Sequence, residues 1–407
     1  MKILNDPIYG FITIKHPILL KLIDHPYFQR LNRIKQLGLS YLVYPGAHHT
    51  RFHHAIGAMH LMQQALEVLK VKNVKITEEE EVGVLIAILL HDIGHGPFSH
   101  ALEHTLVSGV NHEDLSIILM DKLNEEFEGK LNLGIRIFRN TYSKKFLHQL
   151  VSSQLDMDRL DYLKRDSFYS GVSEGVVSSD RIINMLNVHE DQLVIEEKGI
   201  YSIEKFIVAR RLMYWQVYLH KTVLAAENLL VEILKRANFL ASQGEELFAS
   251  PVLKKFLYNN YTKEDFNKEE VIYQFTMLDD SDIYSAIKAW CDHPDKTLSV
   301  ISRNLIDRKL PKIAIQKLPF ENERIEKLKE MVKEKYQISE VEIGHLVFDS
   351  EIANNAYNAK KDIILIKYKN GSVLNITDAS DNFNIQALTE SVKKYFICYP
   401  KEFRNKW

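Results

Sequence analysis

The segment from His91 to His100 holds the side chains of this chain that are best suited to chemistry. Three histidines and one aspartate fall within these ten residues, and Gly94, Gly96 and Pro97 lie between them. Imidazole and carboxylate groups together suit a divalent transition metal, and glycines let the backbone turn tightly enough for such ligands to converge. The segment therefore predicts a metal site. A single histidine at a helix end is, by contrast, more often a hydrogen-bonded core or capping residue.

The spacing from His91 to His95 also resembles the His-Glu-x-x-His pattern of zinc proteases. That pattern needs an uninterrupted helix, with both histidines on one face and the acid acting as the base. The glycines and Pro97 would end a helix within this segment. We therefore do not predict a protease.

An apolar run from Val82 to Leu90 directly precedes the histidines and predicts a helix that is buried on all sides. Thr77 is its expected N-cap, because it begins a Glu-rich turn whose charges complement the helix dipole. Such a helix would deliver His91 and Asp92 to a fixed place.

Other segments carry further candidate groups. His54 lies at the start of a helix predicted to run from Arg51 to about Lys70, and a second helix is predicted over 114–125. The segment 154–162 contains three aspartates, Asp156, Asp158 and Asp161. Either these aspartates belong to a site, or they form a solvated helical face.

The remaining pattern predicts a mainly α protein with a smaller α+β appendage. Its expected elements are a strand over 11–14, helix over most of 16–38, a hairpin around 188–196, one long helix or two nearly collinear helices over 201–240, and further helices to about 307. From residue 311 the hydrophobic pattern changes to short apolar segments at 313–315, 363–366 and 395–398, with a helix over 321–336. We therefore predict a helical domain over 1–310 and an α+β domain over 311–407.

The composition limits the classes of partner. At 407 residues the chain can bury a large core. Because 52 Lys and Arg balance 54 Asp and Glu, no global charge draws it to nucleic acid or to an anionic membrane, although local patches stay open. Cys291 and Cys398 lie far apart, which predicts reduced thiols in a cytoplasmic protein. No signal-like segment begins the sequence, and the apolar run at 82–90 is too short to span a bilayer.

Taken in order, these motifs resemble those of a known family. His54, the His91-Asp92 pair and Asp158 look like the H…HD…D signature of the HD-domain phosphohydrolases. More narrowly, the surrounding sequence resembles the branch of deoxynucleoside triphosphate triphosphohydrolases that includes the vertebrate SAM- and HD-domain enzyme. The resemblance covers about residues 3–315, and the matching segments are 5–8, 28–31, 34–38, 45–47, 91–100, 161–162 and 165–166.

The resemblance implies a metal site and an acid apparatus. The implied ligands of one divalent ion are His54, His91, Asp92 and Asp158. Two imidazoles and two carboxylates would leave a six-coordinate ion open positions for a water and a phosphate oxygen. The choice among Mn, Fe, Zn, Ni and Mg stays open, and additional Mg can accompany a triphosphate. The residues implied around the α-phosphate, as acids or oxyanion stabilisers, are His95, His100, Glu103 and His112.

The resemblance also implies the substrate contacts. Those expected to grip a triphosphate are Arg51, Arg159, Arg210 and Lys221. Those expected near the sugar are Gln36, Tyr162 and Asp166, with Tyr218 packed against the 2′ edge. Asp24 fits the family's guanine-activator position, but Asn32 stands where an Arg is expected, so activation by a guanine nucleotide is not predicted and the nature of any nucleotide activator stays open.

The predicted function is metal-dependent hydrolysis of a dNTP to a deoxynucleoside and inorganic triphosphate. The alternatives are an HD-domain hydrolase of another nucleotide, such as a 5′-nucleotidase or a signalling-nucleotide hydrolase, and a non-enzymatic nucleotide or nucleic-acid sensor. The family assembles through its helical lobes, so a homodimer or homotetramer is expected as well.

Overall fold

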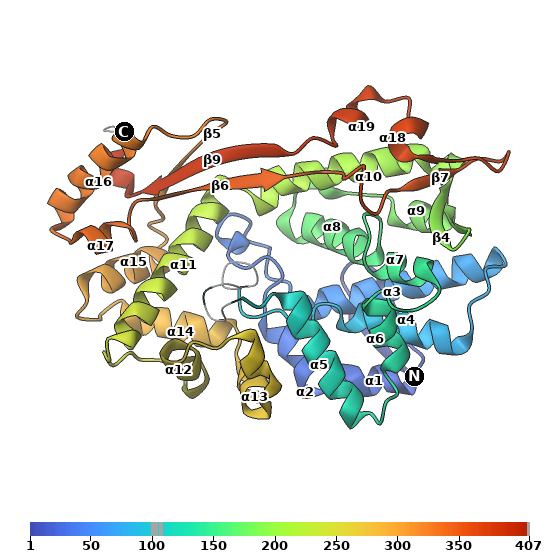
Figure 1. Ribbon diagram of the computed structural model, residues 1–407, viewed down its shortest axis with the longest axis horizontal. Coiled ribbons are helices and arrows are strands. Elements are labelled where there is room, and N and C mark those ends of the chain that lie inside the picture. Colours follow the sequence, from blue (N-terminus) through green and yellow to red (C-terminus); the bar gives the residue numbers. More distant parts are fainter. Residues whose placement is uncertain (99–104, 106–108, 405–407) are drawn as a thin grey trace.

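The computed structural model describes residues 1–98, 105 and 109–404, and it is mainly α-helical (Figure 1). Up to residue 185 its elements are β1 (Lys2–Asp6), β2 (Gly10–Ile14), α1 (Pro17–Asp24), α2 (Pro26–Gln29), α3 (Arg51–Val71), α4 (Glu78–Leu90), α5 (His112–Glu126), α6 (Asn132–Phe138), α7 (Lys145–Val151), α8 (Met157–Ser170) and α9 (Ser179–Met185).

The second half adds more helices and most of the strands. Its elements are β3 (Leu186–His189), β4 (Gln192–Glu196), α10 (Ile200–Met213), α11 (Lys221–Ser242), α12 (Pro251–Tyr258), α13 (Glu269–Met277), α14 (Asp280–Trp290), α15 (Lys296–Ile306), β5 (Lys312–Gln316), α16 (Asn322–Tyr336), α17 (Glu340–Ile343), β6 (Phe348–Asn354), β7 (Leu365–Lys367), β8 (Val373–Asn375), α18 (Ile376–Ala379), α19 (Phe383–Ala387) and β9 (Val392–Tyr399). The mainly α prediction is confirmed.

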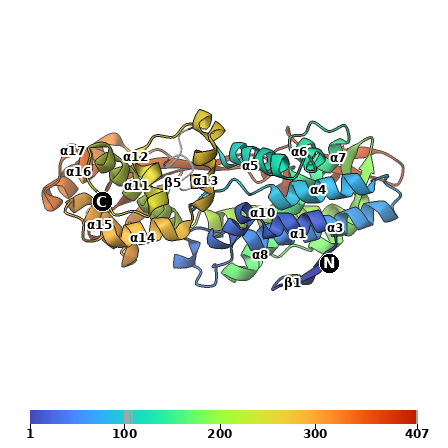
Figure 2. The same ribbon diagram turned by 90° about the horizontal axis from the view of Figure 1, so that it is seen from below.

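The C-terminal segment runs along the length of the molecule. Figures 1 and 2 show helices α12–α17 at one end and α3–α9 at the other, with β6 and β9 leading from the first toward the second. One sheet has the order β5-β9-β6, and another has the order β3-β4-β7-β8. In the second sheet β4 and β7 are parallel, with Val194 opposite Leu365. The C-terminal residues therefore complete a sheet begun in the helical part, and the division at residue 310 stays a prediction.

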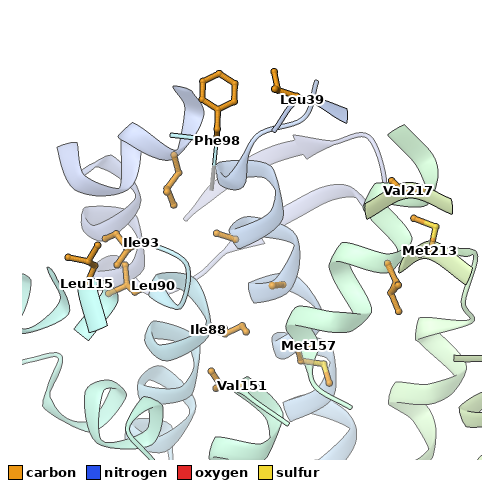
Figure 3. Close-up of a cluster of buried hydrophobic side chains, with 14 of the residues drawn as sticks. Leu39, Ile88, Leu90, Ile93, Phe98, Leu115, Val151, Met157, Met213 and Val217 are labelled. Carbon is orange, nitrogen blue, oxygen red and sulfur yellow. The ribbon is translucent and has the colours of Figure 1, made fainter. Parts of the chain in front are cut away.

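Helix α4 is built as the sequence predicts. Thr77 and Glu80 form a reciprocal capping box, in which the Thr77 hydroxyl accepts from the Glu80 backbone N–H at 3.2 Å. Its apolar residues from Val84 to Leu90 are buried. Figure 3 shows Leu90 and Ile93 beside Leu115 of α5, and Ile88 beside Val151 of α7. Because neighbours surround its C-terminal end, the helix holds the following residues rigidly.

Two other predicted elements are confirmed, a hairpin and a helix. The hairpin near residue 188 is β3–β4, and its turn residues Glu190 and Asp191 have φ of 48° and 62°. The helix predicted at 321–336 is α16. Both cysteines are free and buried. Within the described ranges, no helix combines the length and apolar character that crossing a membrane requires.

Two helical predictions need correction. The segment 16–38 is broken, because His25 before Pro26 is extended and a short 3-10 turn occupies Arg30–Arg33. The stretch 201–240 is not collinear: α10 passes into a π-helical turn at Tyr214–Tyr218, His220 is extended with ψ of 129°, and α11 sets off in a different direction (Figure 1).

Helices α3 and α8 approach each other closely at Gly57. A Cβ atom built on Gly57 would lie 2.1 Å from Arg165 Nη2 and 2.1 Å from Asp161 Oδ1. Both partners are fully buried, so they cannot move into solvent. Glycine is therefore required at this position of α3 for α8 to dock.

Gly57→Ala should lower the free energy of unfolding by about 1–3 kcal/mol, the usual cost of overpacking a core. Thermal or urea unfolding followed by circular dichroism measures this change. Gly344→Ala is the matched control, because its Cβ would meet only Val341 O at an ordinary 3.6 Å. Equal stability of the two variants would contradict the packing argument.

Candidate metal centre

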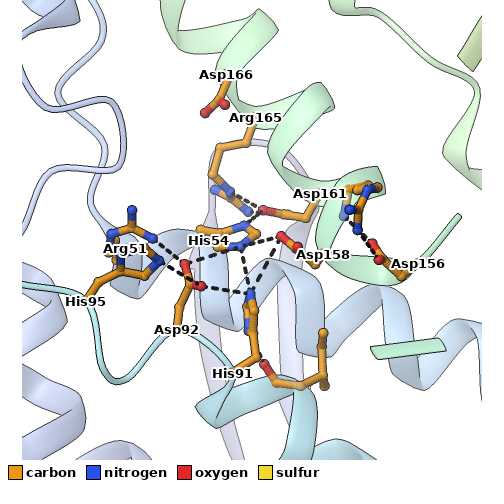
Figure 4. Close-up of polar contacts among 12 residues, drawn as sticks. Arg51, His54, His91, Asp92, His95, Asp156, Asp158, Asp161, Arg165 and Asp166 are labelled. Carbon is orange, nitrogen blue, oxygen red and sulfur yellow. Dashed lines mark hydrogen bonds and ion pairs between the residues drawn. The ribbon is translucent and has the colours of Figure 1, made fainter. Parts of the chain in front are cut away.

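Four predicted ligands meet where α3, α4 and α8 converge (Figure 4). His54 lies in the first turn of α3, His91 is the C-cap of α4, and Asp92 follows it. Asp158 lies in the first turn of α8, whose N-cap Asp156 accepts a hydrogen bond from the Arg159 backbone N–H at 2.7 Å. Helix ends hold all four side chains, so their positions depend on rigid elements.

The distances suit ligands of a single ion. The Nε2 atoms of His54 and His91 are 3.2 Å apart, and Asp158 Oδ1 lies 3.1 Å from the first and 3.6 Å from the second. Asp92 Oδ1 lies 3.4 Å from His91 Nε2. His54, His91 and Asp158 each offer an atom within 4.8 Å of the others. Nitrogen and carboxylate donors that converge on one point are the set that a divalent transition metal prefers.

The Nδ1 atom of each imidazole already makes a hydrogen bond within the protein. His54 Nδ1 donates to Asp161 Oδ2 at 2.8 Å, and His91 Nδ1 donates to the backbone O of Ile88 at 2.7 Å. Such partners fix the ring orientation and the tautomer of a metal ligand. Both Nε2 atoms therefore face the shared point, and the donor set fits a metal.

The electrostatics of the cluster bind its members together. Burial would lower the pKa of His54, but hydrogen bonds to Asp158 and Asp161 raise it to about 10. Burial would raise the pKa of Asp158, yet its hydrogen bonds with His54 and His91 hold that pKa well below the usual range. The Asp158 carboxylate stays ionised and His54 holds a proton, which a cation can replace.

Arg51, His95 and His112 lie beside the metal ligands. Arg51 pairs with Asp92, and His95 Nε2 lies 3.3 Å from Asp92 Oδ1. The rings of His95 and His112 are stacked, with centroids 3.9 Å apart. Two imidazoles thus border the ligand set, which suits handling of protons and oxyanions. The other two predicted members of this group, His100 and Glu103, lie outside the described residues.

The start of α5 is locked to the histidine segment. Ser116 Oγ donates to the backbone O of His91 at 2.8 Å and accepts from Gly94 N at 2.9 Å. A Cβ on Gly94 would lie 2.2 Å from Ser116 N and 2.3 Å from His112 O. The glycine therefore allows α5 to bring His112 against His95.

Tyr162, Tyr218 and Asp166 lie next to the candidate ligands, and we call these three residues the aromatic wall. The ring of Tyr162 is 6.5 Å from that of His54 and 6.1 Å from that of Tyr218. Tyr218 donates from its hydroxyl to Asp166 Oδ2 at 2.8 Å, and His49 Nε2 contacts the other oxygen at 2.7 Å. Burial raises the pKa of Tyr162 and of Tyr218, so both hydroxyls stay protonated.

The structure brings two of the predicted phosphate-binding cations to this wall. Arg159 pairs with Asp156, and the charges of Arg210 and Arg159 both act on Tyr162. Arg210 also donates to the backbone O of Ala356 at 3.2 Å.

Two other predicted substrate residues have different surroundings. Gln36 has a buried side-chain oxygen that finds no hydrogen-bond partner in the described part of the chain. Lys221 is exposed at the start of α11 and lines a hollow with Trp215, Lys317 and Lys394. No contact of Lys221 with the metal ligands is found among residues 1–98, 105 and 109–404.

Sequence reasoning left the role of Asp161 open and gave none to Asp280. Asp161 is fully buried and orients His54, so a solvated face for the segment's aspartates is wrong. Its spacing of three residues from Asp158 on one helix was the available signal. Asp280, at the start of α14, accepts from the backbone N–H groups of Lys35 and Phe98, each at 2.9 Å. No local pattern pointed to this contact.

Comparison with known proteins places these contacts in context. The chain matches the HD domain over residues 51–166 and the HD associated region over residues 177–245. It is 37% identical over 317 residues to uncharacterized protein YwfO of Bacillus subtilis, covering 76% of this chain and 71% of that protein. It is 32% identical over 265 residues to the deoxynucleoside triphosphate triphosphohydrolase SAMHD1 homolog of Dictyostelium discoideum, covering 60% of this chain and only 51% of that protein. The crystal structure of a phosphohydrolase from Bacteroides thetaiotaomicron superposes with a TM-score of 0.95 at 53% identity, covering 98% of this chain and 99% of the other.

Asp161→Asn should weaken divalent-metal binding by about 10–100-fold, the usual effect of losing a carboxylate that orients a ligating histidine. The side chain keeps its size, so the change tests charge rather than volume. Competition with a chelator of known affinity measures the metal affinity. Asp349→Asn, at an exposed position on β6, is the control. An affinity equal to that of the control would remove Asp161 from the metal centre.

Proposed function

We propose that this chain, which belongs to the HD-domain phosphohydrolases, cleaves deoxynucleoside triphosphates to the deoxynucleoside and inorganic triphosphate. The supporting observation is the juxtaposition of the His54, His91 and Asp158 cluster, with Asp92 beside it, with the Tyr162, Tyr218 and Asp166 wall, two arginines and the stacked imidazoles. A hydrolase that needed only the metal would not require that wall.

The protein groups would bind and orient the triphosphate. A divalent ion held by His54, His91, Asp92 and Asp158 would acidify water and offset charge developing on a phosphoryl group. Arg159 and Arg210 carry fixed charge beside Tyr162, where guanidinium groups can contact phosphate oxygens in pairs. Their partners on the protein side, Asp156 and the Ala356 carbonyl, preorganise both side chains.

The sugar would lie against the aromatic wall. Asp166 is occupied on both oxygens, by Tyr218 and by His49, so Tyr218 is held in one orientation. A 2′-hydroxyl placed against this ring would lose its water without gaining a partner, which costs roughly 1–3 kcal/mol. The wall would therefore favour a deoxyribose.

The stacked imidazoles would serve the leaving group. His112 lies one ring away from His95, which in turn contacts the ligand Asp92. A protonated His112 could donate its proton to the departing 5′-oxygen, whereas burial and the charge of Arg51 lower the pKa of His95 and keep that ring neutral. His100 and Glu103 stay predictions for the same apparatus.

The metal-loaded protein should hydrolyse dATP and leave ATP nearly untouched. The products should be deoxyadenosine and inorganic triphosphate, identified by phosphorus NMR and chromatography. Tyr218→Ala should reduce the ratio of dATP turnover to ATP turnover by about ten-fold or more, because a 2′-hydroxyl would then keep its water in place of facing the ring. Tyr201→Ala, exposed on α10, is the control. Equal cleavage of ATP and dATP by the unmodified protein, or a monophosphate product, would instead favour an HD-domain hydrolase of another nucleotide.

His112→Gln should lower dNTP turnover by about 10²–10⁴-fold, the usual contribution of a general acid, with the bound metal unchanged. Steady-state kinetics and elemental analysis measure the two quantities. His189→Gln, on strand β3, is the control. Turnover that matches this control would exclude His112 from the reaction.

A further inference from the structure

The segments 35–38 and 96–98 lie side by side, although they are far apart in the sequence. A Cβ atom built on Gly38 would lie 3.8 Å from the backbone O of Phe98. The first segment contains Gln36, a predicted sugar contact, and the second follows the histidines that border the metal ligands. The separation of the two segments therefore helps to set the distance between Gln36 and those histidines.

A single carboxylate joins the two segments. Asp280, at the start of α14, accepts from the Lys35 backbone N–H through Oδ2 and from the Phe98 backbone N–H through Oδ1, each at 2.9 Å. The residue is 6% exposed, so little water competes for these two hydrogen bonds. Because each oxygen holds a different segment, the carboxylate fixes the gap between them.

Phe98 has a backbone conformation that needs support from its surroundings. Its φ is 52°, in the left-handed region that residues with a bulky side chain rarely adopt. Such conformations persist only where neighbouring contacts enforce them, and they cluster at active sites. The burial of the ring and the hydrogen bond to Asp280 together supply those contacts.

The corner between α13 and α14 is itself anchored to the same region. Phe275 of α13 packs against the Arg30 guanidinium, 4.8 Å from its ring centroid, and Arg30 donates to the backbone O of Ile93 at 2.8 Å. Asp279, beside Asp280 in sequence, pairs with Arg33. The carboxylate that joins the two segments therefore projects from a fixed base.

We propose that Asp280 is a positioning residue of the active site, which keeps Gln36 and the end of the histidine segment in register for one bound nucleotide. This role rests on the proposed function, but it is separable from the metal centre. The backbone of His91 is held independently, because Ser116 Oγ donates to its carbonyl at 2.8 Å. Loss of the Asp280 contacts would therefore displace groups around the substrate and leave the metal ligands in place.

Asp280→Asn tests this role, because an amide keeps the size of the side chain but offers one acceptor oxygen for two N–H groups. Turnover of dATP should fall by about 10–100-fold, since small displacements at a reacting centre are expensive. Steady-state kinetics give kcat and KM, and elemental analysis should find the bound metal unchanged. Asp282→Asn is the matched control: it removes a charge from the same turn of α14, where Asp282 accepts only from the Asp279 backbone N–H at 2.9 Å among the contacts found in the described residues.

Hydrogen–deuterium exchange provides a second measurement that does not depend on the reaction. The amides of Lys35 and Phe98 should exchange faster in Asp280→Asn than in Asp282→Asn, because only the first variant has lost an acceptor for them. Asp280→Glu keeps both acceptor oxygens and should recover part of the lost turnover. Circular dichroism establishes that each variant is folded.

Three results would overturn the positioning role. They are equal turnover of the Asp280→Asn and Asp282→Asn variants, unchanged exchange at both amides, and a loss of bound metal that parallels the loss of turnover. Failure of the proposed function looks different: the unmodified protein would cleave no deoxynucleoside triphosphate, and exchange at the two amides would then decide alone whether Asp280 holds the segments together.

Discussion

The position of His54 depends on a buried chain of charges. Asp161 accepts a hydrogen bond from His54 at 2.8 Å and two from the Arg165 guanidinium, at 2.9 and 3.0 Å. Arg165 also donates to Asp6 at 2.8 Å. Burial would raise the pKa of Asp161, but the charge of Arg165 and the hydrogen bond from His54 lower it to about 2. Removing one member of such a network leaves another charge buried and unpaired, which costs about 3–5 kcal/mol. Asp6 is in turn held by the backbone N–H groups of Ile8 and Tyr9, so the N-terminal turn supports a ligand on α3.

The candidate ligands could be named from the sequence because the resemblance to a known family marks them, and each also lies in a strong local pattern. His91 ends an apolar run with a clear N-cap, and His54 and Asp158 begin helices. The roles of Asp161 and Asp280 were not predictable, because they depend on which helix packs where. A helix with several aspartates can expose them to solvent or bury them in a polar site, and its sequence does not distinguish the two. The close approach of Gly57 to Asp161 shows that α3 packs against this helix. Propensity describes the helix, whereas packing decides which face is buried.

The region after α10 shows the same limit in another form. Its composition favours helix throughout, and helix is what forms, except for the π-helical turn at Tyr214–Tyr218 and the extended His220. A π-helical turn adds a residue and changes the direction of the side chains around it, and such turns are frequent at functional sites. Tyr218 lies at the end of this turn and points to Asp166. Hydrophobic periodicity cannot reveal one inserted residue, so the orientation of this ring and the change of direction into α11 required the structure.

The parallel pairing of β4 with β7 also affects how the chain is made. On a ribosome, β4 emerges with β3 as its paired strand, and its other edge waits until the segment containing Leu365 has been synthesised. During that interval the edge offers free backbone groups to any other strand, and Leu193, Val194 and Ile195 give it an apolar surface. Contacts between distant segments form slowly, and unpaired edges of this kind promote aggregation. The nascent chain is therefore most exposed to aggregation after helices α3, α4 and α8 have emerged and before β7 can pair with β4.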